Sequence, residues 1–124
     1  MNSLDISEGL YKVEMEAARA TSELRSLSLK LNLTEIRTKY AVLTATVSDD
    51  FGRPKPEFTN DAIRTAEYKT RLMDNKEYTS QLEVFFDLKD RRTWLRLEAK
   101  KLRREFKIEF QEEKATRKSR RKSI

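Results

Sequence analysis

The stretch that decides the fold runs from Ile6 to Leu31 and reads ISEGLYKVEMEAARATSELRSLSLKL. Its apolar residues are separated alternately by four and three positions, the spacing that aligns side chains along one face of a helix in a coiled coil. The pattern therefore predicts a long helix whose apolar seam packs against a second helix. The seam positions are Ile6, Leu10, Val13, Ala17, Ala20, Leu24, Leu27 and Leu31.

The apolar pattern changes phase after Leu31. The next seam position would be Thr34, whereas apolar residues resume one position earlier, at Leu33, and continue at helical spacing to Val47. We expect a kink or a change of packing near residues 32–34. The β-branched residues before Val47 would also suit a strand, but no second strand-like segment is evident, so the first helix is predicted over about residues 4–50.

Turn chemistry is concentrated between Asp49 and Phe58. Gly52 can adopt the left-handed conformation that ends a helix, and Pro54 and Pro56 cannot continue one. The chain is therefore predicted to reverse at a hinge of about residues 51–59.

A second helix is predicted over about residues 60–113, with Thr59 as its N-cap. Apolar positions spaced three and four apart recur from Phe85 to Phe106, with Arg92 as a charged member of the seam. The fold class is therefore all-α, a long antiparallel helical hairpin over residues 1–113 that associates into a four-helix bundle. Residues 114–124 form a basic C-terminal tail in this interpretation.

The composition argues against an enzyme. The chain has no His and no Cys, and therefore lacks imidazole bases, thiol nucleophiles and the softer metal ligands. We expect no catalytic, cofactor-binding or metal-binding residues and no cofactor. Acidic residues interrupt the first thirty positions, and no apolar run is long enough for a signal peptide or a membrane span. A cytoplasmic protein without a membrane partner is predicted.

Positive charge gathers at the C-terminal end. Residues 1–88 hold 15 acidic and 12 basic side chains, residues 89–113 hold 6 and 9, and residues 114–124 hold none and 6. A concentrated positive segment attracts polyanions, although a solubilising tail or a contact with an acidic protein would carry the same charge.

The predicted partner is nucleic acid, bound through phosphates without sequence preference, because Lys and Arg match a phosphate backbone without contacting bases. The candidate nucleic-acid-binding residues are Arg103, Arg104, Lys107, Lys114, Arg117, Lys118, Arg120, Arg121 and Lys122.

Large apolar residues also lie off the two seams, where an isolated hairpin would leave them in water. They predict self-association as a homodimer, with a helical protein partner as the alternative. The candidate self-association residues are Met15, Leu29, Phe86, Trp94 and Leu97.

Two short segments carry a resemblance to known proteins. The opening of the second helix, TNDAIRTAE at residues 59–67, and MDNKEY at residues 73–78 resemble small helical-hairpin proteins encoded among phage and prophage replication and recombination genes. The resemblance implies a non-enzymatic accessory role near DNA metabolism and transfers no functional residues. A protein-interaction module, a scaffold or an inhibitor that docks on an acidic protein, is the alternative function.

Overall fold

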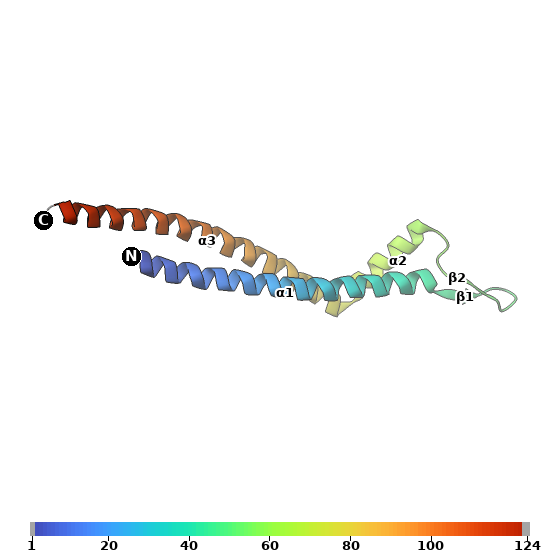
Figure 1. Ribbon diagram of the computed structural model, residues 1–124. Coiled ribbons are helices and arrows are strands. Elements are labelled where there is room, and N and C mark those ends of the chain that lie inside the picture. The colour runs from blue at the N-terminus through green and yellow to red at the C-terminus, as the bar shows by residue number, and fades with distance from the viewer. Residues whose placement is uncertain (1, 123–124) are drawn as a thin grey trace. The chain divides into compact units, whose positions relative to one another are not determined.

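The computed structural model describes residues 2–122, which form helices and one short pair of strands (Figure 1). The predicted all-α helical hairpin is confirmed. The chain divides into two compact units. Unit 1 comprises the residues up to Glu23 and those from Leu88 onward, and unit 2 comprises Leu24–Asp87. The elements are α1 (Ser3–Thr44), β1 (Thr46–Ser48), β2 (Pro54–Pro56), α2 (Asp61–Asp74) and α3 (Lys76–Lys122).

Unit 1 is an antiparallel pair of helical segments, one from α1 and one from α3. Ile6 and Ala20 of α1 and Leu95 and Ala99 of α3 are buried, as the seam prediction requires. The buried positions of this pair include an alanine on each helix, Ala20 and Ala99.

Arg92 occupies the seam of α3 and is half-buried. Its Nε atom is buried without a hydrogen-bond partner. The charged member of the predicted seam is thus accommodated with its side chain only partly in solvent.

Unit 2 is held by a cluster of buried Leu31, Leu72 and Tyr78, which brings α1, α2 and the start of α3 together. Burying large side chains of this kind contributes roughly 1.5–3 kcal/mol each. Half-buried residues complete the cluster: Leu27, Tyr68, Leu82 and Phe85.

The expected phase change after Leu31 is wrong. Helix α1 is unbroken, and its buried face continues in register through half-buried Thr34 and Thr38 to buried Val42. The Thr34 hydroxyl donates to the Lys30 carbonyl at 3.1 Å and the Thr38 hydroxyl to the Thr34 carbonyl at 2.8 Å. Because these hydroxyls are satisfied within the helix, threonine can occupy the seam. The apolar residues that suggested a new phase instead lie on the exposed face: Leu33, Ile36, Tyr40 and Leu43.

The prediction of helix to residue 50 is also wrong, because α1 ends at Thr44 and β1 follows. Strand β1 pairs antiparallel with β2, so that Val47 lies opposite Lys55. The connecting turn is built on Asp49, whose Oδ1 accepts from the backbone N–H of Phe51 at 2.9 Å and of Arg53 at 2.8 Å. Gly52 has the expected left-handed conformation, with a φ of 71°, but it lies in the turn between the strands and does not end the helix.

Proline is tolerated in β2 because of where it stands in the ladder. Backbone bonds join Asp49 to Arg53 at 2.8 Å and Glu57 to Ala45 at 2.9 Å. Bonded and non-bonded pairs alternate in an antiparallel ladder. Pro54 and Pro56, opposite Ser48 and Thr46, are therefore at positions that need no N–H.

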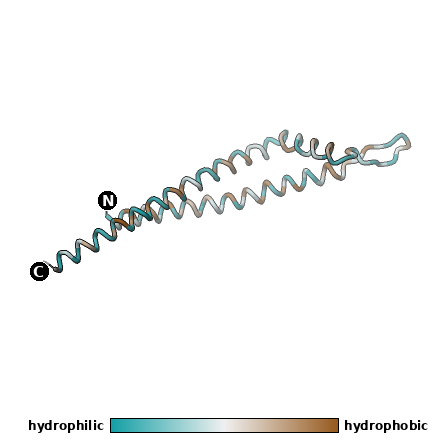
Figure 2. The backbone as a smooth tube through the Cα atoms, turned by 90° about the horizontal axis from the view of Figure 1, so that it is seen from above, coloured by the Kyte–Doolittle hydropathy of each residue, from teal (hydrophilic) through white to brown (hydrophobic). Residues whose placement is uncertain are grey.

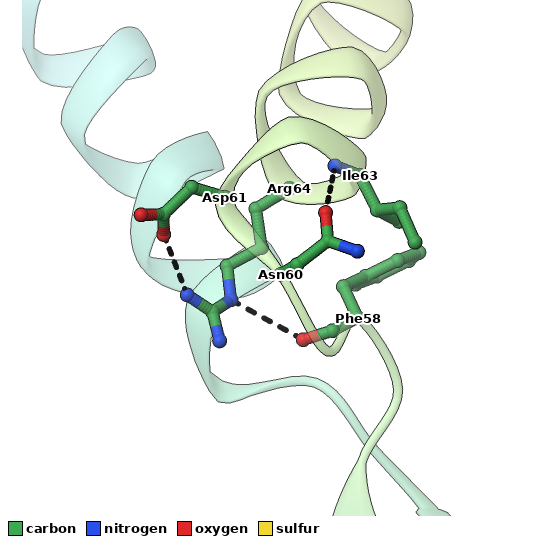
Figure 3. A network of polar contacts seen from close by, with 5 residues as sticks. All are labelled: Phe58, Asn60, Asp61, Ile63 and Arg64. Atoms are coloured by element: carbon green, nitrogen blue, oxygen red, sulfur yellow. Dashed lines mark hydrogen bonds and ion pairs between the residues drawn. The ribbon is translucent and has the colours of Figure 1, made fainter.

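Helix α2 is capped by Asn60, so the prediction of Thr59 as the N-cap is wrong by one residue. The Asn60 side-chain oxygen accepts from the Ile63 backbone N–H at 2.9 Å (Figure 3). Arg64 stabilises the same turn, because it donates to the Phe58 carbonyl at 3.2 Å and to the Asp61 carboxylate at 2.9 Å.

The single second helix expected over residues 60–113 is two helices that meet at Asn75. The backbone N–H of Asn75 donates to the Arg71 and Leu72 carbonyls at 3.1 and 3.2 Å, which ends α2. Its side-chain oxygen accepts from the Tyr78 N–H at 3.0 Å, which caps α3. Helix α3 then continues through Lys122, so the described part of the predicted tail is helical.

Candidate nucleic-acid interface

The candidate site is one face of α3. Between Arg96 and Arg121 the basic residues recur at alternating spacings of four and three, so they share one side of the helix. Phe110, half exposed, occupies the one position of this row that is not basic. We call the row the basic face of α3; its residues are Arg96, Lys100, Arg103, Lys107, Lys114, Arg117 and Arg121.

Acidic residues of the same segment lie on a different side of α3. Glu98, Glu105, Glu109 and Glu112 are spaced by seven, four and three, and at about 100° per residue they lie roughly half a turn from the basic face. No acidic residue follows Glu113 in the sequence. Most carboxylates of this segment therefore lie away from the basic face, where Lys101 pairs with Glu105 at 4.0 Å, while Glu113 lies beside Arg117.

Near α1, the basic face lines a groove with a floor of small residues. Arg96, Lys100 and Arg103 contribute its cations, and Ala17 and Ala18 contribute part of its floor. Trp94, the one tryptophan of the chain, is 62% exposed. The small residues leave an open groove instead of receiving a bulky side chain.

Arg103 is the member of the basic face that has a carboxylate partner across the helix pair. Its Nε and Nη2 atoms donate to Glu14 Oε1 at 3.1 and 2.5 Å. Both side chains are largely exposed. An exposed ion pair contributes roughly 0–1 kcal/mol, so a phosphate can compete for this arginine.

Glu113 fixes where α3 passes the end of α1. It accepts from the Ser3 backbone N–H at 3.0 Å and from the Ser3 hydroxyl at 2.6 Å. Since Ser3 is the first residue of α1, residues 114–122 extend past it by about 13 Å (Figure 1). Helix α3 therefore keeps a contact with α1 as far as Glu113.

The structure brings together five of the nine predicted nucleic-acid-binding residues on the basic face, and Lys118 lies beside Lys114 one turn on. Arg104 and Arg120 fall off this face. Lys122 is the last residue of α3, and its side chain lies outside the described residues. The hydropathy colouring of Figure 2 shows the C-terminal end of α3 as strongly hydrophilic. The five are Arg103, Lys107, Lys114, Arg117 and Arg121.

Arg96 and Lys100 also belong to the basic face, although the predicted set of binding residues begins at Arg103. The four-three spacing of basic residues crosses residue 113, so the predicted boundary between helix and tail divides one continuous row. Because α3 is one helix through Lys122, basic residues spaced four and three apart on both sides of residue 113 lie on the same side of it.

The predicted self-association residues are all exposed, as their proposed role requires. Phe86 packs edge-on against Phe85, with 5.7 Å between ring centroids. The exposed fractions are 50% for Met15, 71% for Leu29, 54% for Phe86, and 62% for both Trp94 and Leu97.

Residues 2–122 show neither a metal-ion cluster nor a membrane-spanning helix. Acidic residues there form no group of three or more that could hold a metal ion. No helix in this range combines the length and the apolar character needed to cross a bilayer.

Compared with models of protein families, with curated proteins and with solved structures, the chain matches none of them.

Proposed function

We propose that this protein is a non-enzymatic, cytoplasmic accessory factor that binds nucleic acid without sequence preference through the basic face of α3. The observation that carries the proposal is the alignment of seven cations on one side of a continuous helix between Arg96 and Arg121. At 1.5 Å per residue this row is about 37 Å long.

A row of this kind suits a phosphate backbone. Each Lys or Arg that neutralises a phosphate releases counterions, and the affinity gained is independent of base sequence. Phe110 supplies an aromatic ring within the row, next to Phe106 at 5.9 Å between ring centroids. Aromatic side chains among cations are a common arrangement in proteins that bind single strands.

A role in phage or mobile-element DNA replication or recombination is supported by the resemblance of residues 59–67 and 73–78. The alternative function is a scaffold or inhibitor that docks on an acidic protein. One observation favours this second candidate. Arg103 donates to the Glu14 carboxylate, so the basic face already binds a carboxylate within the protein.

Self-association as a homodimer is also part of the proposal. It is supported by exposed Trp94 and Leu97, which lie one turn apart on α3, on the side away from buried Leu95 and Ala99. Large apolar side chains gathered on one side of a helix are a common mark of association.

The test compares two triple variants with the same change in charge. The first, Lys107→Glu with Lys114→Glu and Arg117→Glu, reverses the middle of the basic face. The matched control, Lys12→Glu with Lys69→Glu and Lys76→Glu, reverses three exposed lysines elsewhere. Affinity for a labelled single-stranded and a labelled duplex oligonucleotide is measured by fluorescence anisotropy at low salt.

We expect the basic-face variant to lose at least about tenfold in affinity, and the control to change little, because local charge outweighs net charge at a phosphate contact. Equal losses of affinity in the two variants would show that binding depends on net charge and not on where the cations lie. An intact protein that binds no oligonucleotide but binds an acidic protein such as a polyglutamate-rich domain would favour the alternative function.

A further inference from the structure

The exposed face of α1 in unit 2 carries a second apolar row, which the packing of unit 2 leaves uncovered. Five large residues on it are between 47% and 71% exposed. They are separated by four, three, four and three positions and lie on the side of α1 opposite buried Leu31 and Val42. The row, which we call the outer row, consists of Leu29, Leu33, Ile36, Tyr40 and Leu43.

The spacing of the outer row indicates that a helix can cover it. Alternating steps of four and three are the pattern by which one helix receives the side chains of another. From Leu29 to Leu43 the row is about 21 Å long, or four helical turns. A helix with a matching apolar seam would cover the full length.

The charges that α1 itself places beside the outer row are all positive. Two carboxylates from neighbouring helices also lie near the row: Glu77 lines a groove with Leu33, and Asp61 lines one with Leu43. Lys30, Arg37 and Lys39 stand next to row positions, and Arg25 lies one turn before Leu29, all with exposed side chains. The one carboxylate between Leu24 and Thr44 is that of Glu35, which accepts from the Tyr78 hydroxyl on the packed side of α1.

We propose that the outer row is a docking surface for an acidic amphipathic helix of a partner protein. Its apolar seam would cover the five exposed residues, and its flanking Glu or Asp side chains would meet Lys30, Arg37 and Lys39. A second copy of the same surface fits less well, because it would bring these basic side chains close to one another. The proposal is independent of nucleic-acid binding by α3.

The probe for this surface is a synthetic peptide of about 28 residues, four heptads with Leu at a and d and Glu at e and g. Glutamates at e and g also discourage pairing of the peptide with itself. Two comparison peptides carry Lys in place of Glu, or the same residues in scrambled order. Binding of the labelled peptides to the full-length protein is measured by fluorescence anisotropy.

We expect the Glu peptide to bind at least about tenfold more tightly than either comparison peptide, with an affinity that falls as salt is raised. Ile36→Glu should weaken this binding by about tenfold or more. Tyr11→Glu, which makes the same change at an equally exposed position of α1 outside the row, should leave it unchanged. Both positions are exposed, so the circular dichroism spectrum and melting curve check that each variant folds.

Three results would overturn the proposal. Equal binding of the Glu and Lys peptides would show that charge does not select the partner. A homodimer in sedimentation equilibrium that Ile36→Glu dissociates would make the outer row an interface between copies. Loss of oligonucleotide binding in Ile36→Glu would assign the row to nucleic acid instead.

Discussion

The Tyr78 hydroxyl donates to Glu35 Oε1 at 2.7 Å, which joins the first turn of α3 to the C-terminal part of α1 within unit 2. Tyr78 is 6% exposed, so its ring belongs to the core while its hydroxyl reaches a charged partner. Burial, together with the hydrogen bond and the charge of Glu35, raises the pKa of Tyr78 to about 12.

This pairing predicts a loss of stability at high pH. A tyrosine whose folded pKa is raised above its unfolded value near 10 stabilises the fold fully below that pH and loses the effect as the pH rises towards 12. The free energy of unfolding, measured with urea, should therefore fall between these two values. In Tyr78→Phe the free energy of unfolding should fall less steeply over the same pH range. Its free energy of unfolding at neutral pH should be lower by about 1.5 kcal/mol, the loss of one charge-assisted hydrogen bond. Identical pH profiles for the two proteins would contradict the assignment.

Glu113 predicts the opposite pH dependence. The Ser3 hydroxyl and the Ser3 backbone N–H both donate to Glu113, and they lower the pKa of its carboxyl. A lowered folded pKa gives stability that is present above the unfolded pKa and is lost as the pH falls through the folded one. Glu113→Gln should therefore lower the melting temperature at pH 7 more than at about pH 3. Glu112→Gln, one position away and exposed, is the control and should show a smaller difference.

The cap of α2 gives a prediction that separates two neighbouring residues. Asn60→Ala removes the oxygen that accepts from Ile63, and should cost about 1 kcal/mol in the free energy of unfolding. Thr59→Ala should cost much less, since Asn60 and not Thr59 is the N-cap. Urea unfolding of the two variants measures both values. A larger cost for Thr59→Ala would place the start of the helix one residue earlier.

Removal of the C-terminal end tests the proposed binding of nucleic acid. Deleting Lys114–Ile124 removes six cations and leaves the hydrogen bonds between Glu113 and Ser3 in place. Affinity for any oligonucleotide should weaken, with a shallower dependence on salt. The log–log slope should change by about 0.9 for each duplex phosphate that the shortened protein no longer neutralises, and by about 0.7 for each phosphate of a single strand. A truncated protein that binds as tightly as the intact one would make these residues a solubilising extension.

Self-association is predicted through α3. Sedimentation equilibrium of the intact protein should show a dimer, and Trp94→Ser combined with Leu97→Ser should shift it to a monomer with an unchanged helical spectrum. Burial of each large side chain between copies contributes roughly 1.5–3 kcal/mol. A folded monomer of the intact protein at high concentration would exclude this dimer.

The sequence predicts the hairpin and the buried seam to Leu31 because apolar residues alone mark that seam. Beyond Leu31 the seam passes through Thr34 and Thr38, whose hydroxyls bond to carbonyls of their own helix. Such residues are polar in the sequence yet can be half-buried, so the sequence pattern alone predicts a change of phase that the helix does not have.

The hairpin of β1 and β2 could not be predicted from strand-like composition, since PKP in β2 contains two residues that usually exclude a strand. It forms because Asp49 organises the turn through its side chain. The charge composition of the sequence predicts that the candidate site lies at the C-terminal end. Which basic residues share one face follows only from the continuity of α3 through Lys122.

The two prolines of β2 also determine whether another strand can pair with the outer edge of β2. Pro54 and Pro56 stand at the non-bonded positions opposite β1, so the edge of β2 that faces away from β1 is the edge towards which their N–H groups would have pointed. Prolines have none, and that edge therefore offers no amide donors at these positions to an incoming strand. A short, exposed ribbon is thereby protected against edge-to-edge aggregation and against the strand exchange by which unprotected hairpins join one molecule to the next.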